Sequence, residues 1–444
     1  MKLKSSPIIT GTFYLCIAGI ITRLLGFVYR VWLGNLIGPE ELGIYQLVFP
    51  VFSICLALCG SPFQTAISKF TAEHALNKPE KARMYFLTAF LISFIIAIAE
   101  GILILLFRSQ IAIFFLLNER CTQLLPYIAI CIPLSAVHSC ISGWYYGIQN
   151  ASVPAFSNIL EQTIRMLFVF FLVQSQVDFS VIHVCLALAA GELAAFLFSS
   201  FMFFCRQIRK KNISAFKWRT RSFHADSEYL RNLYRLTWPL AANRLSLSFL
   251  QSIEAVMIPS RLILFGLSES LALSLYGTLT GMAMNFIYFP TALTGSFSLL
   301  LLPDIAQAWN EKRYAHIRKA SVLSIFAAFF TGLLFWLLFL CFGIQIGQLC
   351  FPGTRTGEYL KTLSWLCPFI YSNGIIVSIL HGLGRTAQTF RTQFSAYLIR
   401  LAITVFLVPF YGMTCYFIAL LITQIYLNLV NGAALSKILA LNHI

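Results

Sequence analysis

Long apolar stretches, separated by short segments rich in charged and turn residues, dominate the chain. Each is long enough to cross a bilayer as a helix. They fall at about 8–33, 43–67, 84–107, 121–148, 154–174, 181–204, 236–260, 272–302, 320–342, 359–380, 389–408 and 412–436. No small-residue cleavage site precedes Arg23, so we expect the first stretch to be a retained span and not a removed signal peptide. The pattern predicts an all-α polytopic membrane protein with about 12 transmembrane helices.

Composition and charge agree with this topology. Of the 444 residues, 59% are hydrophobic and only 11% are charged, which excludes an ordinary soluble domain. With the N-terminus inside, 22 of the 32 Lys and Arg residues fall in cytoplasmic segments and five in outer loops. We therefore predict a multi-pass cell-membrane protein with both termini in the cytoplasm. The net charge of +16 is explained by topology and anionic membrane lipids, so no nucleic-acid partner is expected.

The chain divides into two halves that share sequence features at corresponding positions. We expect an N-terminal six-helix lobe at 1–205, a basic cytoplasmic linker at 206–235 and a C-terminal six-helix lobe at 236–444. Phe-Pro near one end of a span recurs in the two halves, at Pro50 and at Pro290, each with a second proline 12 or 13 residues later. Two halves that both begin inside form a parallel repeat, whose lobes can rock about a central cavity.

Glycine-rich helix exits also correspond between the halves. "GWYYGIQN" ends the fourth span and "HGLGR" follows the tenth. Because backbone hydrogen bonds are interrupted at such places, we expect paired hinges or gates there. Static kinks for close helix packing are the alternative that the sequence leaves open. The candidate hinge residues are Gly143, Gly147, Gly382, Gly384, Pro50 and Pro290.

Two arginines lie on one face of the first span. Arg23 and Arg30 are seven positions apart in "ITRLLGFVYR", which is nearly two helical turns. Gly26 and Phe27 lie between them on that face. A charge at the bilayer centre costs at least about 2.5–3.5 kcal/mol, so both arginines are expected to face protein, water or a ligand. For Arg30, snorkelling to the membrane surface is an equal alternative.

Other charges also occupy spans. Arg244 and Arg400, like Arg23 and Arg30, have no acid within one helical turn, whereas Glu161 and Arg165 are spaced to neutralise each other. Arginine binds phosphate through a planar fork that stays charged when it is desolvated. We therefore predict a cationic cavity that binds a pyrophosphate headgroup. Its candidate substrate-binding residues are Arg23, Arg30, Arg244, Arg400 and Arg165, and the candidate ion-coupling groups or charge partners are Glu254, Glu192 and Glu161.

Several long segments carry a family resemblance. These are "TRLLGFVYR", "GIYQLVFPVFSICLALCGSPFQTAISK", "GWYYGIQNASVPAFSNILEQTIR" and "LYGTLTGMAMNFIYFPTALTGSFSLLLLPDIAQA". They resemble the stage V sporulation protein B group of polysaccharide biosynthesis proteins, in the multidrug/oligosaccharidyl-lipid/polysaccharide (MOP) exporter superfamily that also includes lipid II flippases. The resemblance implies a V-shaped bundle of two lobes that works by alternating access, with Arg23 and Arg30 in the cavity. Many members have fourteen spans, so two C-terminal helices would be missing here.

Three classes of function follow. The first is a flippase for an undecaprenyl-pyrophosphate-linked oligosaccharide or peptidoglycan precursor in cell-wall or spore-cortex synthesis. The second is a cation-coupled multidrug antiporter of the same superfamily, which a cavity richer in Arg than in acid disfavours. The third, a membrane enzyme, lacks support because the chain has no DxD, HExxH or GxSxG motif.

Cofactor chemistry finds little support in the sequence. The 12 cysteines form no CxxC pairs, so we expect neither a metal site nor a disulfide framework. His138 lies alone on an apolar helix, where packing is the expected role and a proton relay the alternative. No ATP-binding loop is present, so we expect no cofactor and a drive from Na⁺, H⁺ or the membrane potential. Membrane lipids and a lipid-linked glycan are the expected partners, and the sequence does not specify the oligomeric state.

Overall fold

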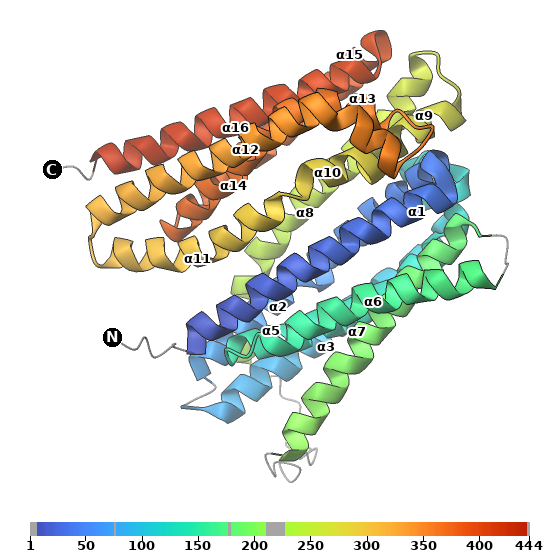
Figure 1. Cartoon of the computed structure of the whole chain (residues 1–444). Helices are drawn as coiled ribbons and strands as arrows, with labels where there is room; N and C mark the ends of the chain where they lie inside the picture. The colour runs from blue at the N-terminus through green and yellow to red at the C-terminus, as the bar shows by residue number, and fades with distance from the viewer. Residues whose placement is uncertain (1–6, 75–76, 176–178, 210–226, 442–444) are drawn as a thin grey trace. The chain divides into compact units, whose positions relative to one another are not determined.

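The computed structural model describes residues 7–74, 77–175, 179–209 and 227–441, and in these ranges the chain forms helices and connecting turns without strands. The helices are α1 (Pro7–Cys59), α2 (Ser61–His74), α3 (Pro79–Leu106), α4 (Arg108–Gln110), η1 (Ile111–Phe115), η2 (Glu119–Gln123), α5 (Leu125–Gly147), α6 (Ser152–Gln174), α7 (Val181–Arg209), α8 (Ser227–Leu264), α9 (Glu269–Gly277), η4 (Thr278–Ala283), α10 (Met284–Tyr288), α11 (Thr291–Asn310), α12 (Tyr314–Cys350), α13 (Thr356–Leu363), η5 (Ser364–Leu366), α14 (Cys367–Gly382), α15 (Thr386–Tyr411) and α16 (Met413–Leu441) (Figure 1).

The helices agree with the predicted number of spans. Among the described residues, ten helical stretches are long and apolar enough to cross a membrane. One of them, Gly19–His74, covers the predicted span at 43–67 and the part of the span at 8–33 that follows residue 18, and Gly38 interrupts its helical geometry with φ 76° and ψ 173°. The predicted span at 272–302 is divided among α9, η4, α10 and α11, and it is not one of the ten. The all-α polytopic fold with about 12 helices is thus confirmed.

The chain forms two compact units. Unit 1 comprises residues 1–22 and 48–249, and unit 2 comprises residues 23–47 and 250–444. The middle of α1 therefore belongs to unit 2, and the first part of α8 belongs to unit 1. The predicted linker at 206–235 lies within the range of unit 1, although its residues 210–226 are outside the described part of the chain.

Helix packing follows the same order inside each unit. In unit 1, α5 packs against α2, α3 and α7, and α6 packs against α7. In unit 2, α14 packs against α11, α12 and α16, and α15 packs against α16 (Figure 1). These four helix pairs of unit 1 thus have counterparts in unit 2, as the repeated proline and glycine positions of the sequence indicate.

The glycines of the two helix exits lie at close helix contacts. A Cβ added at Gly143 of α5 would lie 3.0 Å from Gln64 Cα of α2, and one added at Gly147 would lie 2.7 Å from Ser68 O. In unit 2, a Cβ added at Gly382 of α14 would lie 3.0 Å from the Leu302 carbonyl oxygen of α11. These three positions therefore permit close packing of corresponding helix pairs.

The remaining candidate hinge residues lie at or near helix ends, or inside a helix. Gly384 follows α14 with a φ of 74°, a conformation that favours glycine. Pro290 directly precedes α11, whereas Pro50 lies inside α1. Hinge motion at any of these positions stays a prediction.

The first turns of α8 are anchored in unit 1. Tyr85 of α3 stacks on Phe70 of α2 with ring centroids 4.2 Å apart, and it forms an edge-to-face pair with Tyr229 of α8, with ring centroids 4.7 Å apart. Asn232 of α8 donates a 3.1 Å hydrogen bond to the Tyr85 hydroxyl. The neighbouring Leu233 is buried in the same cluster. These contacts fix the start of α8 to α2 and α3.

Candidate functional site

The predicted face of α1 contacts α10 and α11 inside unit 2. Arg23 donates a hydrogen bond of 3.4 Å from Nη1 to Thr291 Oγ1 at the start of α11. Its guanidinium group also lies against Gly295, where an added Cβ would be 3.3 Å from both Nη1 and Nη2. The absence of a side chain at Gly295 therefore makes room for the Arg23 fork.

Arg30 is held about two turns further along the same face. It donates from Nη1 to Asn285 Oδ1, and the Asn285 amide nitrogen donates to the Gly281 carbonyl oxygen. The second bond orients the Asn285 side chain, so that its oxygen faces Arg30. Between the two arginines, Phe27 packs on Phe286 with ring centroids 4.9 Å apart. Helical periodicity thus placed Arg23, Phe27 and Arg30 on one face correctly.

This arginine face, which we define as Arg23, Gly26, Phe27 and Arg30, keeps an open position at Gly26. A Cβ added there would meet no atom within 4 Å. The Arg23 and Arg30 side chains are both exposed. Because Thr291 and Asn285 are neutral, these two hydrogen bonds orient the guanidinium groups without cancelling their charge. Both guanidinium groups of the face are thus held by hydrogen bonds to α10 and α11.

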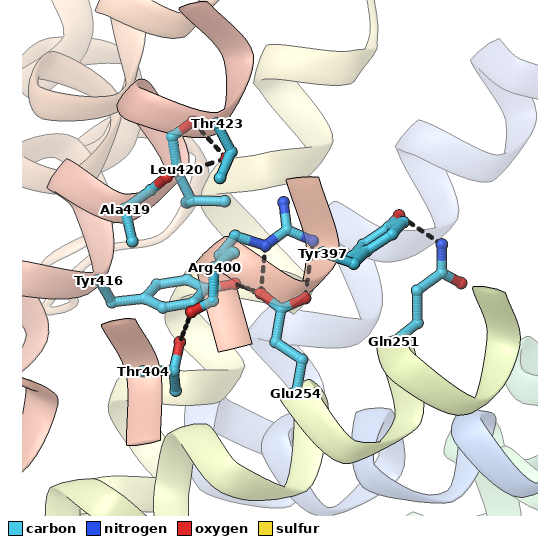
Figure 2. Close-up of polar contacts among 9 residues, drawn as sticks. All are labelled: Gln251, Glu254, Tyr397, Arg400, Thr404, Tyr416, Ala419, Leu420 and Thr423. Atoms are coloured by element: carbon cyan, nitrogen blue, oxygen red, sulfur yellow. Dashed lines mark hydrogen bonds and ion pairs between the residues drawn. The ribbon is translucent and has the colours of Figure 1, made fainter. Parts of the chain in front are cut away.

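Arg400 lies in a different environment in unit 2. Its guanidinium group contacts Glu254 of α8 through Nε at 2.5 Å and through Nη2 at 2.6 Å (Figure 2). The Tyr416 hydroxyl of α16 donates a 2.7 Å hydrogen bond to Glu254 Oε1. Glu254 is only 4% exposed, and both of its oxygens accept hydrogen bonds. The carboxylate therefore neutralises Arg400.

The Arg400 pair is part of a larger set of polar contacts among α8, α15 and α16. Figure 2 shows the Tyr397 ring beside Arg400, with its centroid 4.7 Å from the guanidinium carbon. Gln251 of α8 donates a 2.5 Å hydrogen bond to the Tyr397 hydroxyl, and Thr404 donates to the Arg400 carbonyl oxygen. Every charged group drawn in this cluster has an opposite charge beside it.

The last two candidate arginines belong to unit 1. Arg244 is exposed on α8, and it takes part in none of the ion pairs that the structure shows among the described residues. Arg165 of α6 is buried, and its Nη2 lies 2.5 Å from Glu161 Oε1 as the i,i+4 spacing indicated. Glu192 of α7 accepts a 2.5 Å hydrogen bond from the Ser135 hydroxyl of α5.

The structure brings together partners that the sequence reasoning missed. Thr291 and Asn285 orient the arginine face, Tyr416 completes the Glu254 pair, and Ser135 binds Glu192. Asn285 and Thr291 are polar residues on either side of Pro290 in an apolar segment, and this pattern was the sequence signal that could have indicated them. In the described ranges, no group of three or more His, Cys, Asp or Glu side chains is placed to hold a metal ion.

Comparisons with known proteins bear on the chain as a whole. The profile of the family described as "Polysaccharide biosynthesis protein" matches residues 8–309. Stage V sporulation protein B of Bacillus subtilis (strain 168) is 24% identical, over 99% of this chain and 86% of that protein. Lipid II flippase MurJ of the same organism is 21% identical, over 70% of this chain and 60% of that protein.

A solved structure shares the fold. An inward-facing multidrug resistance MATE family transporter of the MOP superfamily superposes with a TM-score of 0.74, over 98% of this chain and all of that chain. The two sequences are 15% identical, so the likeness concerns the fold alone.

Proposed function

Because this chain belongs to the polysaccharide biosynthesis protein family, we propose that it is a flippase for a lipid-linked glycan precursor. Its substrate is an oligosaccharide or peptidoglycan precursor on an undecaprenyl pyrophosphate carrier, and it crosses the cytoplasmic membrane by alternating access. The protein is a membrane transporter of the MOP superfamily. It therefore moves its substrate and does not make or break covalent bonds in it.

The arginine face is the observation that carries this proposal. Arg23 and Arg30 lie on one face of α1 in unit 2, where they donate hydrogen bonds to the neutral side chains of Thr291 and Asn285, and the position of Gly26 between them is open. A pyrophosphate group offers oxygens at two linked phosphorus centres, which suits two bidentate donors on one helix face. The lipid tail can stay in the bilayer while the headgroup meets these charges, so the whole amphiphile need not enter water.

The other predicted arginines receive different roles. Arg244 is exposed and takes part in none of the ion pairs of the described residues, so it remains a candidate for the headgroup. Arg165 and Arg400 each lie against a glutamate, and we assign them to charge balance inside the helix bundle. Substrate recognition thus falls mainly to exposed cations.

The named relatives point in the same direction. A relative named as a lipid II flippase and one named as a sporulation protein both align with this chain. Transport would be driven by an ion gradient or the membrane potential, because the sequence contains no nucleotide-binding loop. We infer from the positive-inside bias that both termini lie in the cytoplasm.

Reconstitution of the purified protein into proteoliposomes tests the proposal. We expect a lipid-linked pyrophosphate sugar to appear on the opposite leaflet faster than in protein-free vesicles. Uptake of a fluorescent organic cation is measured in parallel and should stay at the protein-free level. Cation uptake without lipid translocation would overturn the proposal and support a multidrug antiporter.

A further inference from the structure

A polar network joins three helices inside unit 1. Glu161 and Arg165 of α6 form an ion pair of 2.5 Å, and Glu192 of α7 accepts a 2.5 Å hydrogen bond from Ser135 of α5. Glu192 is 7% exposed and Ser135 is 4% exposed. The arginine face does not include these residues.

The two carboxylates are close enough to influence each other. A Cβ added at Gly191, directly before Glu192, would lie 3.0 Å from the Glu161 carbonyl oxygen and 3.3 Å from Arg165 Nε. The α7 backbone at Glu192 therefore packs directly on the turn of α6 that carries the ion pair. Glu192 interacts electrostatically with both Glu161 and Arg165.

The remaining titratable groups around Glu192 come from the same three helices and from η2. Cys131 of α5 interacts electrostatically with Glu192, Glu161 and Arg165, and it also neighbours Cys185 of α7, which in turn neighbours Cys121 of η2. His138 of α5 faces Glu161, and its Nδ1 lies 3.3 Å from the Ser157 hydroxyl. Arg165 is the one fixed cation among these groups.

The formal charges of the network do not balance. Two carboxylates face one guanidinium group, so the ionised network carries one net negative charge within helices that span the membrane. An unbalanced charge there is costly by at least about 2.5–3.5 kcal/mol. In unit 2, by contrast, Glu254 and Arg400 balance one to one. This network therefore needs one further positive charge to be neutral.

A proton is the neutralising charge that this geometry suits. Glu161 is already held by Arg165, and one Glu192 oxygen is held by Ser135. A hydroxyl can donate to a carboxylate or accept from a carboxylic acid, so Ser135 can stay bonded to Glu192 in both protonation states. The described residues offer no group of three or more ligands for a metal ion.

We propose that unit 1 contains a proton-binding site in which Glu192, beside the Glu161–Arg165 pair and bonded to Ser135, carries one exchangeable proton. This site would supply the coupling ion for the proposed flippase, and that coupling role rests on the proposed function. The binding of the proton itself does not rest on it.

Infrared difference spectra of the purified full-length protein, recorded between acidic and neutral pH, test the site. We expect the carbonyl band of a protonated carboxyl group to titrate in the wild type and to be lost in Glu192→Gln. The amide oxygen of that variant would still accept a hydrogen bond from Ser135, which preserves packing. Glu161→Gln should also lose the band, because the remaining carboxylate then balances Arg165. Persistence of the band at full amplitude in Glu192→Gln would overturn the proposal.

Matched variants separate this site from other buried groups. Glu100→Gln on α3 removes a different intramembrane carboxyl group, so any part of the band that belongs to Glu100 is identified and subtracted. His138→Gln should leave the Glu192 band in place. A Na⁺-dependent rise in melting temperature that Glu192→Gln abolishes, with no titrating Glu192 band, would show that the site takes a metal cation and would also overturn the proposal.

Proteoliposomes then test the coupling role independently. An imposed pH gradient should alter the flipping rate of the wild type at least severalfold and should not alter that of Glu192→Gln. If the infrared band is lost in Glu192→Gln but the wild type moves no lipid-linked sugar, the proton site stands and the proposed function is wrong. Flipping that responds equally to the gradient in both proteins would remove the coupling role.

Discussion

At the residue scale, Arg23 carries the most direct prediction. Its side chain is exposed, and its contact with Thr291 is a single long hydrogen bond, so Arg23→Ala should leave folding and abundance intact. A hydrogen bond to a charged group contributes about 1.5–3 kcal/mol, so we expect flipping to fall roughly 10- to 100-fold. Arg23→Lys should also be impaired, because a point charge does not reproduce a bidentate fork.

Lys319→Ala provides the matched control for Arg23. Lys319 is an exposed cation near the start of α12, and its removal should leave the flipping rate unchanged. Wild-type rates in a well-expressed Arg23→Ala protein would contradict a role in headgroup binding. Full rescue by Arg23→Lys would show that net charge alone is required.

The buried Glu254–Arg400 pair should act through stability. Removing one partner leaves an uncompensated charge in a buried site, which costs about 3–5 kcal/mol. Arg400→Gln and Glu254→Gln should therefore each lower the melting temperature of the purified protein clearly. The double variant should recover much of the loss, because no lone charge remains. A double variant as unstable as the sum of the two single variants would show that the residues act independently.

Sequence spacing identified some of these roles and could not identify others. Periodicity predicts neighbours on one helix, so it found the shared face of Arg23 and Arg30 and the Glu161–Arg165 pair. Arg400 and Glu254 are 146 positions apart, and their contact depends on how α8 packs against α15. Thus the sequence shows Arg400 as an unpaired charge, whereas the fold supplies its partner.

At the level of helices, the packing of α14 on α11 predicts that Gly382 is required for close contact between these two helices. A Cβ added at Gly382 would lie 3.0 Å from the Leu302 carbonyl oxygen and 3.1 Å from Ile305 Cβ. Gly382→Ala should therefore destabilise the protein by about 1–3 kcal/mol, as expected for overpacking. Thermal unfolding of the detergent-solubilised protein measures this loss.

Gly374 is the control on the same helix. A Cβ added there would meet no atom within 4 Å, so Gly374→Ala should be neutral or stabilise α14 by up to about 1 kcal/mol. Equal destabilisation by both variants would contradict the packing role of Gly382. A normal melting temperature with lost flipping in Gly382→Ala would instead support the hinge prediction.

Helix positions were predictable because apolar length determines a span, but helix continuity was not. The helical residues before and after Gly38 correspond to the apolar stretches at 8–33 and 43–67, and Gly38 kinks the chain between them, because a single positive φ suffices to redirect it. The stretch at 272–302 contains π-helical geometry at Thr278–Ala283 and a break at Pro290. Such local irregularities depend on neighbouring contacts that hydropathy does not contain.

At the scale of the whole molecule, the positive-inside bias predicts the orientation in the membrane. Lys312 and Arg313, between α11 and α12, should face the cytoplasm, and Arg120 in η2 should face the outside. Single cysteines at positions 313 and 120, in a background without other cysteines, can be labelled with a membrane-impermeant maleimide on intact cells. We expect labelling at position 120 only, and labelling at position 313 alone would reverse the topology.

We propose that the arginine face selects a pyrophosphate-linked lipid for translocation. The most direct measurement compares, in proteoliposomes, the flipping rates of lipids that carry the same sugar and tail on a pyrophosphate, a monophosphate or an uncharged linkage. We predict the highest rate for the pyrophosphate lipid, a lower rate for the monophosphate and the protein-free rate for the uncharged lipid, with the preference lost in Arg23→Ala. Equal rates for all three lipids in the wild-type protein would contradict the claim.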